Sequence, residues 1–235
     1  MFASIIIVFL CLNTVQHASL LKNENISNEI INYYVNATST RSLDCGLTIL
    51  IPCKQIDNVF KFLRTSDQYI IHVSDGQYDH DLFVYDGFKD DFYPSVDIAS
   101  ERDALINITG QLTPIGKIIV NFSKFSIDFG DLYFLIDDDK SSLKFSSCNL
   151  FRNAGSNAIN TYSLAIVNHG SLILEKVNID GDNLKGNEPL IQSASPKLIQ
   201  FTSLTVTNIT LTLGNTSPLL LSVTELKQES NIAIS

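Results

Sequence analysis

The chain has 235 residues, of which 45% are hydrophobic and 17% are charged. With 16 Lys and Arg against 25 Asp and Glu, its formal net charge is −9. This composition excludes a disordered chain, and the acidic balance argues against nucleic acid as a partner, because phosphates require a basic surface. The length suits one large domain or two small ones with a substantial core.

An apolar run near the N-terminus predicts secretion. Residues 4–12 read SIIIVFLCL, which is about half of the 20 or so apolar residues that a membrane-spanning helix needs. That length fits a secretory signal peptide. We therefore expect a signal peptide over residues 1–18, cleaved after Ala18, although no Lys or Arg precedes the run and Gln16 stands where a small residue is usual. The alternative is a buried strand. The mature chain is then expected to have no integral membrane span.

Secretion makes glycosylation and disulfide formation relevant. Cys45 and Cys53 lie eight residues apart in a loop with Gly and Pro, so we expect them to pair in an oxidising compartment. Cys148 is then left over, and we expect it to be a buried apolar residue. Some of six Asn-X-Ser/Thr sequences are expected to carry glycans, and they start at Asn25, Asn36, Asn107, Asn121, Asn208 and Asn215.

The predicted elements follow a polar, Asn-rich lead-in at residues 19–43. Residues 44–66 hold the disulfide loop and then KQIDNVFKFLR, whose apolar spacing predicts a short amphipathic helix. Residues 68–73 and 82–85 predict strands, and Ser74-Asp75-Gly76 between them predicts a turn. Residues 86–104 are an irregular loop with the sequence KDDFYP, and residues 226–235 are a polar tail.

From residue 118 onward the chain repeats itself. Four windows with alternating apolar residues start at Val120, Leu143, Leu172 and Thr202, which are 23, 29 and 30 residues apart. This period indicates a solenoid, and the two-residue alternation excludes helical repeats. We therefore predict an all-β fold, a parallel β-helix over residues 67–225. The rival fold is an antiparallel β-sandwich, which the scarcity of Asn-Gly and Asp-Gly turns disfavours.

The windows also predict which side chains stack between coils. One expected interior column contains Phe145, Leu174 and Leu204, and another contains Leu150, Ile179 and Ile209. A third set, Asn149, Asn178 and Asn208, shares one position in the last three windows. We expect these Asn side chains to form a hydrogen-bonded ladder at a bend. Coincidence in an Asn-rich chain is the alternative.

The segment DCG…PCK, the amphipathic helix, the strand and the following SDGQY resemble secreted right-handed parallel β-helix proteins. More narrowly, they resemble the surface or secreted proteins of protists with a pectin-lyase-like fold. The resemblance implies a right-handed coil whose N-terminal end is covered by a cap at residues 44–66. It is most specific over residues 44–80, and the coils at 118–223 match in style only. Most members of that class have no known activity, so the resemblance implies a fold rather than a reaction.

Enzymes of that fold class cleave acidic polysaccharides, with an Asp cluster and a base or with paired carboxylates. The candidates here are Asp137, Asp138, Asp139, Asp180 and His169, which lies in an Asn-His-Gly sequence. The simpler explanation is that these side chains lie in turns and are exposed to solvent. The remaining motifs of such enzymes are missing. The charge of −9 and the absence of Trp also suit an anionic sugar poorly. We expect no catalytic residue, no metal ligand and no cofactor, since zinc and phosphate motifs are missing too.

The leading hypothesis is a secreted, glycosylated, non-catalytic β-helix that serves as a surface, adhesion or matrix module. Its partner would be a glycan or a cell-surface protein, and its location extracellular or on the cell surface. One alternative is a polysaccharide lyase or glycoside hydrolase of the same fold. Another is a degenerate or incomplete fragment, because no C-terminal cap is evident in the sequence.

Overall fold

The computed structural model describes residues 27–63, 66–80, 92–108, 112–129, 133–152, 163–186, 188–211, 218, 220–225 and 230–235. The predicted signal peptide, the predicted strand at 82–85, Asn25 and Asn215 lie outside these residues. The elements in chain order are β1 (Ser27–Val35), α1 (Ile56–Phe60), β2 (Ser66–Val73), β3 (Gln77–His80), β4 (Ser95–Ile108), β5 (Leu112–Ile115), β6 (Ile119–Asp128), β7 (Tyr133–Ile136), β8 (Ser142–Ser146), β9 (Asn149–Phe151), β10 (Ala165–Val167), β11 (Ser171–Glu175), β12 (Asn178–Gly186), β13 (Ile191–Ser193), β14 (Leu198–Thr202), β15 (Thr205–Leu211), β16 (Leu221–Val223) and β17 (Asn231–Ile234).

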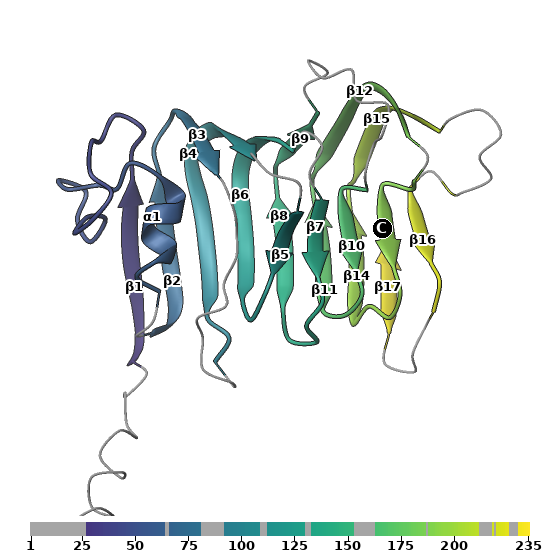
Figure 1. Ribbon diagram of the computed structural model, residues 1–235, viewed down its shortest axis with the longest axis horizontal. Helices are drawn as coiled ribbons and strands as arrows, with labels where there is room; N and C mark the ends of the chain where they lie inside the picture. Colours follow the sequence, from purple (N-terminus) through teal and green to yellow (C-terminus); the bar gives the residue numbers. More distant parts are fainter. Residues whose placement is uncertain are drawn as a thin grey trace, which may run out of the picture.

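The strands form two parallel sheets wound as a β-solenoid (Figure 1). The longer sheet runs in the order β1-β2-β4-β6-β8-β11-β14-β17, and the shorter sheet runs in the order β16-β13-β10-β7-β5. Strands β3, β9, β12 and β15 pair beside the longer path. Among these strands every pairing is parallel. The predicted parallel solenoid is therefore confirmed, and the antiparallel sandwich is excluded.

Apolar side chains at paired positions of the longer sheet stack in two interior columns. The first contains Ile31, Tyr69, Val96, Val120, Leu143, Leu172, Ile199 and Ile232, and the second contains Tyr33, Ile71, Ile98, Phe122, Phe145, Leu174, Phe201 and Ile234. From β2 to β14, every member of both columns is at most 2% exposed. Phe122 and Phe145 stack with their ring centroids 5.6 Å apart. Each coil therefore buries its apolar residues against the coil before and the coil after it.

The fourth repeat begins three residues earlier than the sequence predicted. Leu174 pairs with Phe201 rather than Leu204, and Ile179 pairs with Val206 rather than Ile209. The repeat therefore starts at Ile199. The prediction was wrong because residues 202–209 carry the same apolar alternation and also an Asn in the expected position.

The same shift shortens the predicted Asn ladder. Asn178 Nδ2 donates to Asn149 Oδ1 at 3.0 Å, as expected. Asn208 lies elsewhere, because its Nδ2 donates to Asp180 Oδ1 at 2.9 Å. The ladder thus joins two coils, and in the next coil Thr205 pairs with Asn178 instead.

A corner residue with positive φ turns the backbone in each of five successive coils. These residues are Asp103, Lys124, Ser147, Lys176 and Ser203, with φ of 81°, 62°, 54°, 54° and 55°. Such φ values are uncommon for residues other than Gly. Ala104, Phe125, Cys148 and Val177 directly follow the first four corners, and all four are buried. Cys148 is therefore a core residue, as predicted, and Leu204 follows the fifth corner.

The predicted irregular loop at residues 86–104 was wrong over its second half, because β4 begins at Ser95 and buries Val96 and Ile98 in alternation. Strand pairing also extends beyond the predicted coil region at both ends. Strand β1 lies in the polar lead-in and pairs with β2, whereas β17 lies in the polar tail and pairs with β14. Helix α1 contacts β1, β2 and β3, and Ile56, Val59 and Leu63 on or just after it are at most 1% exposed. Within the described residues, no helix is long and apolar enough to cross a membrane.

Candidate functional site

The disulfide loop is attached to the outer edge of β1. Cys45 and Cys53 are bonded, as predicted, with their Cα atoms 4.9 Å apart. The Tyr34 N–H donates to the Gly46 carbonyl at 2.7 Å, and the Cys53 N–H donates to the Tyr34 carbonyl at 2.9 Å. Asn36 N–H then donates to the Cys53 carbonyl at 2.8 Å. Both ends of the loop are thus fixed to one strand.

Between its fixed ends, the loop exposes a run of aliphatic side chains. We call residues 47–51, which read LTILI, the aliphatic loop. Leu47 is 66% exposed, Ile49 68%, Leu50 88% and Ile51 41%. The Ile51 N–H donates to the Thr48 carbonyl at 3.1 Å, and the Gly46 N–H donates to the Ile51 carbonyl at 2.7 Å. Four exposed aliphatic side chains together form the kind of patch that marks an interaction site.

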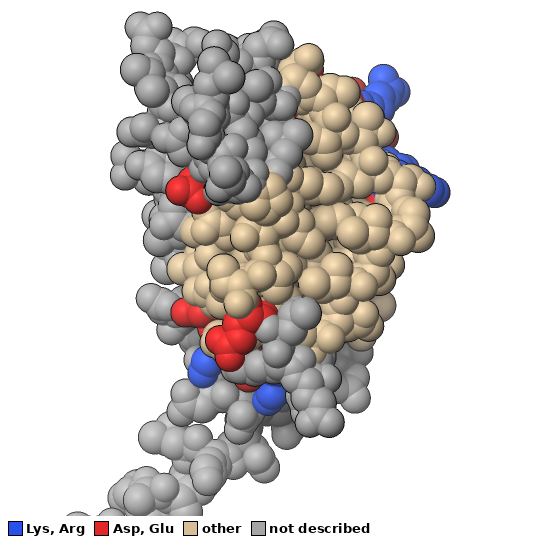
Figure 2. All heavy atoms as spheres, turned by 90° about the vertical axis from the view of Figure 1, so that its right-hand side faces the viewer, with Lys and Arg blue, Asp and Glu red and all other residues tan. Residues whose placement is uncertain are grey.

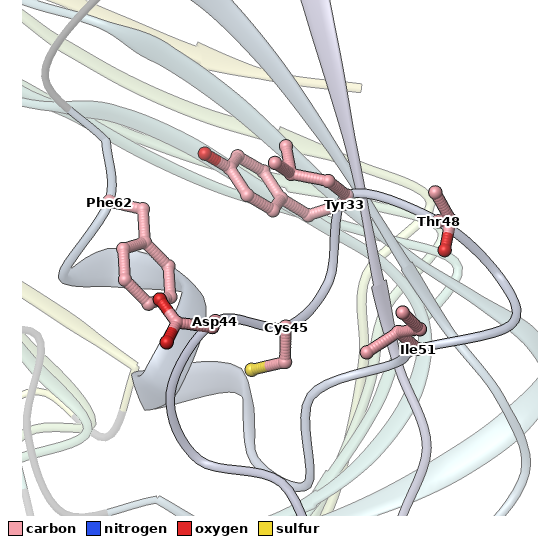
Figure 3. Close-up of a pocket in the computed structure, with 7 residues that line it drawn as sticks. Tyr33, Asp44, Cys45, Thr48, Ile51 and Phe62 are labelled. Atoms are coloured by element: carbon pink, nitrogen blue, oxygen red, sulfur yellow. The ribbon is translucent and has the colours of Figure 1, made fainter.

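A pocket of about 320 Å³ adjoins this loop (Figure 3). Its lining is Tyr33, Asp44, Cys45, Leu47, Thr48, Ile51 and Phe62. Tyr33 stacks on Phe62, with ring centroids 6.4 Å apart, and burial and then the nearby Tyr69 raise the pKa of the Tyr33 phenol. Apart from the Asp44 carboxylate, the lining is neutral, so the pocket suits an apolar group and lacks an acid–base pair.

The predicted acidic turn holds a structural carboxylate. Asp138 Oδ2 accepts a hydrogen bond from the Tyr93 hydroxyl at 3.0 Å. Its Oδ1 accepts from the Lys140 backbone N–H at 3.0 Å and from the Ser141 hydroxyl at 3.3 Å. Lys140 also lies over the Tyr93 ring, 5.0 Å from its centroid. Asp138 therefore stabilises the turn between β7 and β8.

His169 lies in the corresponding turn of the next coil. Its Nδ1 is 3.5 Å from Asp139 Oδ1, so the structure brings together two of the sequence-predicted candidates. The neighbouring Gly170 has a φ of 69°, and a Cβ there would lie 2.5 Å from the Asp138 carbonyl oxygen. The Asn-His-Gly sequence is thus explained by a close approach of two turns, which only Gly permits.

Asp180 lies far from this pair of turns. Strand β11 (Ser171–Glu175) separates Asp180 from Gly170 along the same coil, and five residues of strand span about 16 Å. The Asp180 carboxylate accepts the hydrogen bond from Asn208 on the outer surface. Among the residues that the structure describes, no group of three or more His, Cys, Asp or Glu is arranged to hold a metal ion.

The side-chain amides of the four described sequon asparagines make two different kinds of hydrogen bond. Asn36 follows β1, and its Oδ1 accepts from the backbone N–H and the hydroxyl of Thr38, at 2.9 and 2.8 Å. The other three donate Nδ2, the atom that carries an N-linked glycan, to a carboxylate of the preceding coil. These pairs are Asn107–Asp79 at 3.1 Å, Asn121–Asp97 at 3.2 Å and Asn208–Asp180 at 2.9 Å.

A second uncharged surface lies at the end of the solenoid formed by β16 and β17. Figure 2 faces this end and shows a broad area without Lys, Arg, Asp or Glu. Ile234, the last member of the second interior column, is 70% exposed there, whereas Ile232 and Leu221 are partly buried. The two ends of the molecule therefore both present aliphatic side chains, on a loop at one end and on strands at the other.

Comparison with known proteins adds no relative. The chain matches no protein-family model, no curated protein and no solved structure. The site's function is therefore argued from its own geometry.

The exposed character of the aliphatic loop was not predicted. The segment was expected only to form a disulfide loop, although five of the seven residues between Cys45 and Cys53 are Leu, Ile or Pro and none is charged. An uncharged run between two paired cysteines was the available signal, since a loop so short cannot bury all of its own side chains. Tyr93 was also missed, because its contact with Asp138 spans 45 residues.

Proposed function

We propose that the chain is a secreted, non-catalytic β-solenoid that acts as a surface, adhesion or matrix module. The observation that carries this proposal is the pair of interior columns, which make a rigid body, combined with an aliphatic loop held outward by a disulfide. A rigid body presents a fixed loop to a partner with little loss of conformational entropy on binding. The disulfide is also what an extracellular protein retains and a cytosolic one generally loses.

The finer fold class is part of this proposal. Residues 44–66 are proposed to cap the N-terminal end of a right-handed, pectin-lyase-like coil. Two features support a cap: Ile56, Val59 and Leu63 are buried against the first coils, and the loop hydrogen-bonds to the edge of β1. A covered edge prevents pairing with the strands of other molecules. The right-handed sense follows the general preference of parallel crossover connections.

Glycosylation is proposed for this extracellular protein, with Asn36 as the best-placed described site. Asn36 follows the end of β1, and its Oδ1 interacts with the Thr of its own sequon. Within the described part of the chain, its Nδ2 donates no hydrogen bond to a carboxylate of a neighbouring coil. At Asn107, Asn121 and Asn208, a glycan on Nδ2 would replace a hydrogen bond between coils. We expect the mature chain to begin after Ala18.

Expression of the full chain through a eukaryotic secretory pathway tests this proposal. Mass spectrometry of the medium, before and after glycosidase treatment, should show a chain trimmed near residue 18 with glycan mass that Asn36→Gln reduces. The purified protein should bind cells or a glycan array saturably. An intracellular product that retains Met1 and carries no glycan would contradict the proposal.

The enzymatic alternative rests on one observation, the 3.5 Å approach of His169 to Asp139. A carboxylate beside an imidazole is a possible acid–base pair. Incubation of the purified protein with polygalacturonate and with neutral glucans should release no product under the non-catalytic proposal. Product release that Asp139→Asn and His169→Ala each abolish would favour the enzyme instead.

A further inference from the structure

The aliphatic loop combines an apolar tip with a charged base. At the tip, Leu50 is 88% exposed and Ile49 is 68% exposed. At the base, the Lys54 N–H donates to the Arg41 carbonyl at 2.7 Å, which places these two residues side by side. Figure 1 shows the segment between β1 and α1 projecting beyond the end of the sheet. We propose that this loop docks the protein on a lipid surface that carries anionic headgroups.

The apolar tip is a permanent feature of the folded chain. The disulfide closes the loop, and the hydrogen bonds to Tyr34 and Asn36 fix both of its ends to β1. The preceding Leu43 is also 65% exposed. The loop therefore cannot fold back to bury these side chains in the solenoid, whose interior columns are already filled. Burial of the tip has to come from another surface.

Charge at the base of the loop favours an anionic surface. Arg41 and Lys54 are both exposed, and Asp44 is the one acidic residue between them. The whole chain carries a charge of −9, so an anionic membrane would repel most of the molecule. Two cations beside an uncharged tip thus select the orientation in which this end faces the headgroups.

The chemistry of the tip favours lipid over a protein partner. Protein interfaces are enriched in aromatic residues and Arg at their centres, whereas residues 47–51 are Leu, Thr, Ile, Leu and Ile. Acyl chains accept aliphatic groups without matched shape. The hydrogen bonds among Gly46, Thr48 and Ile51 satisfy part of the loop backbone, so we infer shallow insertion at the boundary between headgroups and acyl chains.

This inference rests on the proposed function, because an extracellular location preserves the Cys45–Cys53 disulfide. Flotation of the purified, oxidised full chain with phosphatidylcholine vesicles containing about one-fifth phosphatidylserine tests it directly. Ile49→Asp should weaken binding about tenfold or more. Ile234→Asp is the matched control, since Ile234 is 70% exposed at the opposite end and the substitution adds the same charge. It should bind like the wild type.

A spectroscopic reporter gives a second readout. The chain has no Trp, so Leu50→Trp introduces a single indole at the tip. Its emission should shift to the blue when vesicles are added, whereas the emission of Ile234→Trp should not. Arg41→Gln with Lys54→Gln should remove the preference for phosphatidylserine-containing vesicles over phosphatidylcholine alone.

Three results would overturn the inference. These are no flotation of the wild type, equal flotation of Ile49→Asp and wild type, or no spectral shift of Leu50→Trp. Self-association of the wild type that Ile49→Asp abolishes, without vesicle binding, would assign the loop to a protein interface instead. The vesicle assay uses purified protein, so a negative result there would not contradict secretion or cell binding. Likewise, a negative result in the secretion or cell-binding experiments would not contradict vesicle binding.

Discussion

Strand β11 and the aliphatic loop contain similar residues but differ completely in burial. Leu172 and Leu174 of β11 are at most 1% exposed, whereas Leu47 and Leu50 of the loop are 66% and 88% exposed. Strand β11 has a parallel neighbour on each side, β8 and β14, whereas the loop pairs with β1 only at its ends. Neighbouring coils, rather than residue type, therefore decide which aliphatic side chains stabilise the fold and which remain available for binding.

The largest contrast should come from placing the same charge in the two regions. Leu174→Asp buries an unpaired carboxylate between coils and should cost more than about 4 kcal/mol of unfolding free energy. Leu50→Asp should leave urea denaturation almost unchanged, because the side chain is already in water. Glu175→Lys, on the outward face, should be tolerated although it loses the ion pair with Lys144. Similar losses for Leu174→Asp and Glu175→Lys would contradict the assigned inward and outward faces.

The next largest loss of stability should come from Gly170, where the backbones of two neighbouring turns approach closely. Gly170→Ala places a Cβ 2.5 Å from the Asp138 carbonyl oxygen and 2.6 Å from that of Ser141, at a φ of 69°. This substitution should lower the free energy of unfolding by about 3 kcal/mol, measured by thermal or urea unfolding. His169→Ala should cost far less, since the His169 side chain is 36% exposed. The opposite ranking would mean that His169, and not Gly170, holds the two turns together.

Removal of the disulfide tests the loop side of the comparison. Cys45→Ala with Cys53→Ala removes a disulfide between residues that are eight positions apart in the sequence. The double variant should lose about 2 kcal/mol of unfolding free energy, a value at the low end for disulfides because the closed loop is short. Protease cleavage between residues 45 and 53 should accelerate, while the coils keep their circular dichroism. Loss of the whole β signal would show that the coils depend on this loop for folding.

An alkaline titration should give the smallest of these effects. Burial raises the pKa of the Cys148 thiol to about 11, so the folded chain keeps a proton that the unfolded chain releases near pH 9. Stability from this group is therefore complete below pH 9 and falls as pH rises toward 11. At pH 10, wild type should have lost about 1 kcal/mol relative to Cys148→Val. Identical pH profiles, or rapid alkylation of native Cys148 at pH 8, would contradict this burial.

Much of the coil architecture was predictable because parallel coils repeat one alternation. Val120, Leu143 and Leu172 begin windows that the structure places in register. The fourth window was misplaced because Asn208 matched the position of Asn149 and Asn178. The frame that starts at Ile199 has apolar residues at all four repeat positions, whereas the frame from Thr202 has Thr at two of them. The corner at Ser203, with its φ of 55°, agrees with the start at Ile199. The corner residues in the coils are Asp, Lys and Ser, so no Gly marked the bends.

The candidate site was predictable only in part. The Cys45–Cys53 pair followed from spacing, and the helix that begins at Ile56 followed from periodicity. The exposure of Leu50 had a local signal, the uncharged run between the paired cysteines, whereas the contact between His169 and Asp139 depends on how turns of different coils meet, which no local pattern encodes. Strand β1 was missed because it lies in the Asn-rich lead-in at residues 19–43, although five of its nine residues are Ile, Tyr or Val. Tyr33 and Val35 carry its buried alternation.

Disulfide trapping across the coils tests the assigned register most directly. Residues paired in parallel strands lie about 5 Å apart, within the span of a disulfide. Glu175 is paired with Thr202, whereas the register expected from sequence alone pairs Glu175 with Thr205. In a Cys148→Val background, Glu175→Cys with Thr202→Cys should form a bond under mild oxidation, detected by peptide mass spectrometry, and Glu175→Cys with Thr205→Cys should not. A bond in the second variant and none in the first would contradict the solenoid as described.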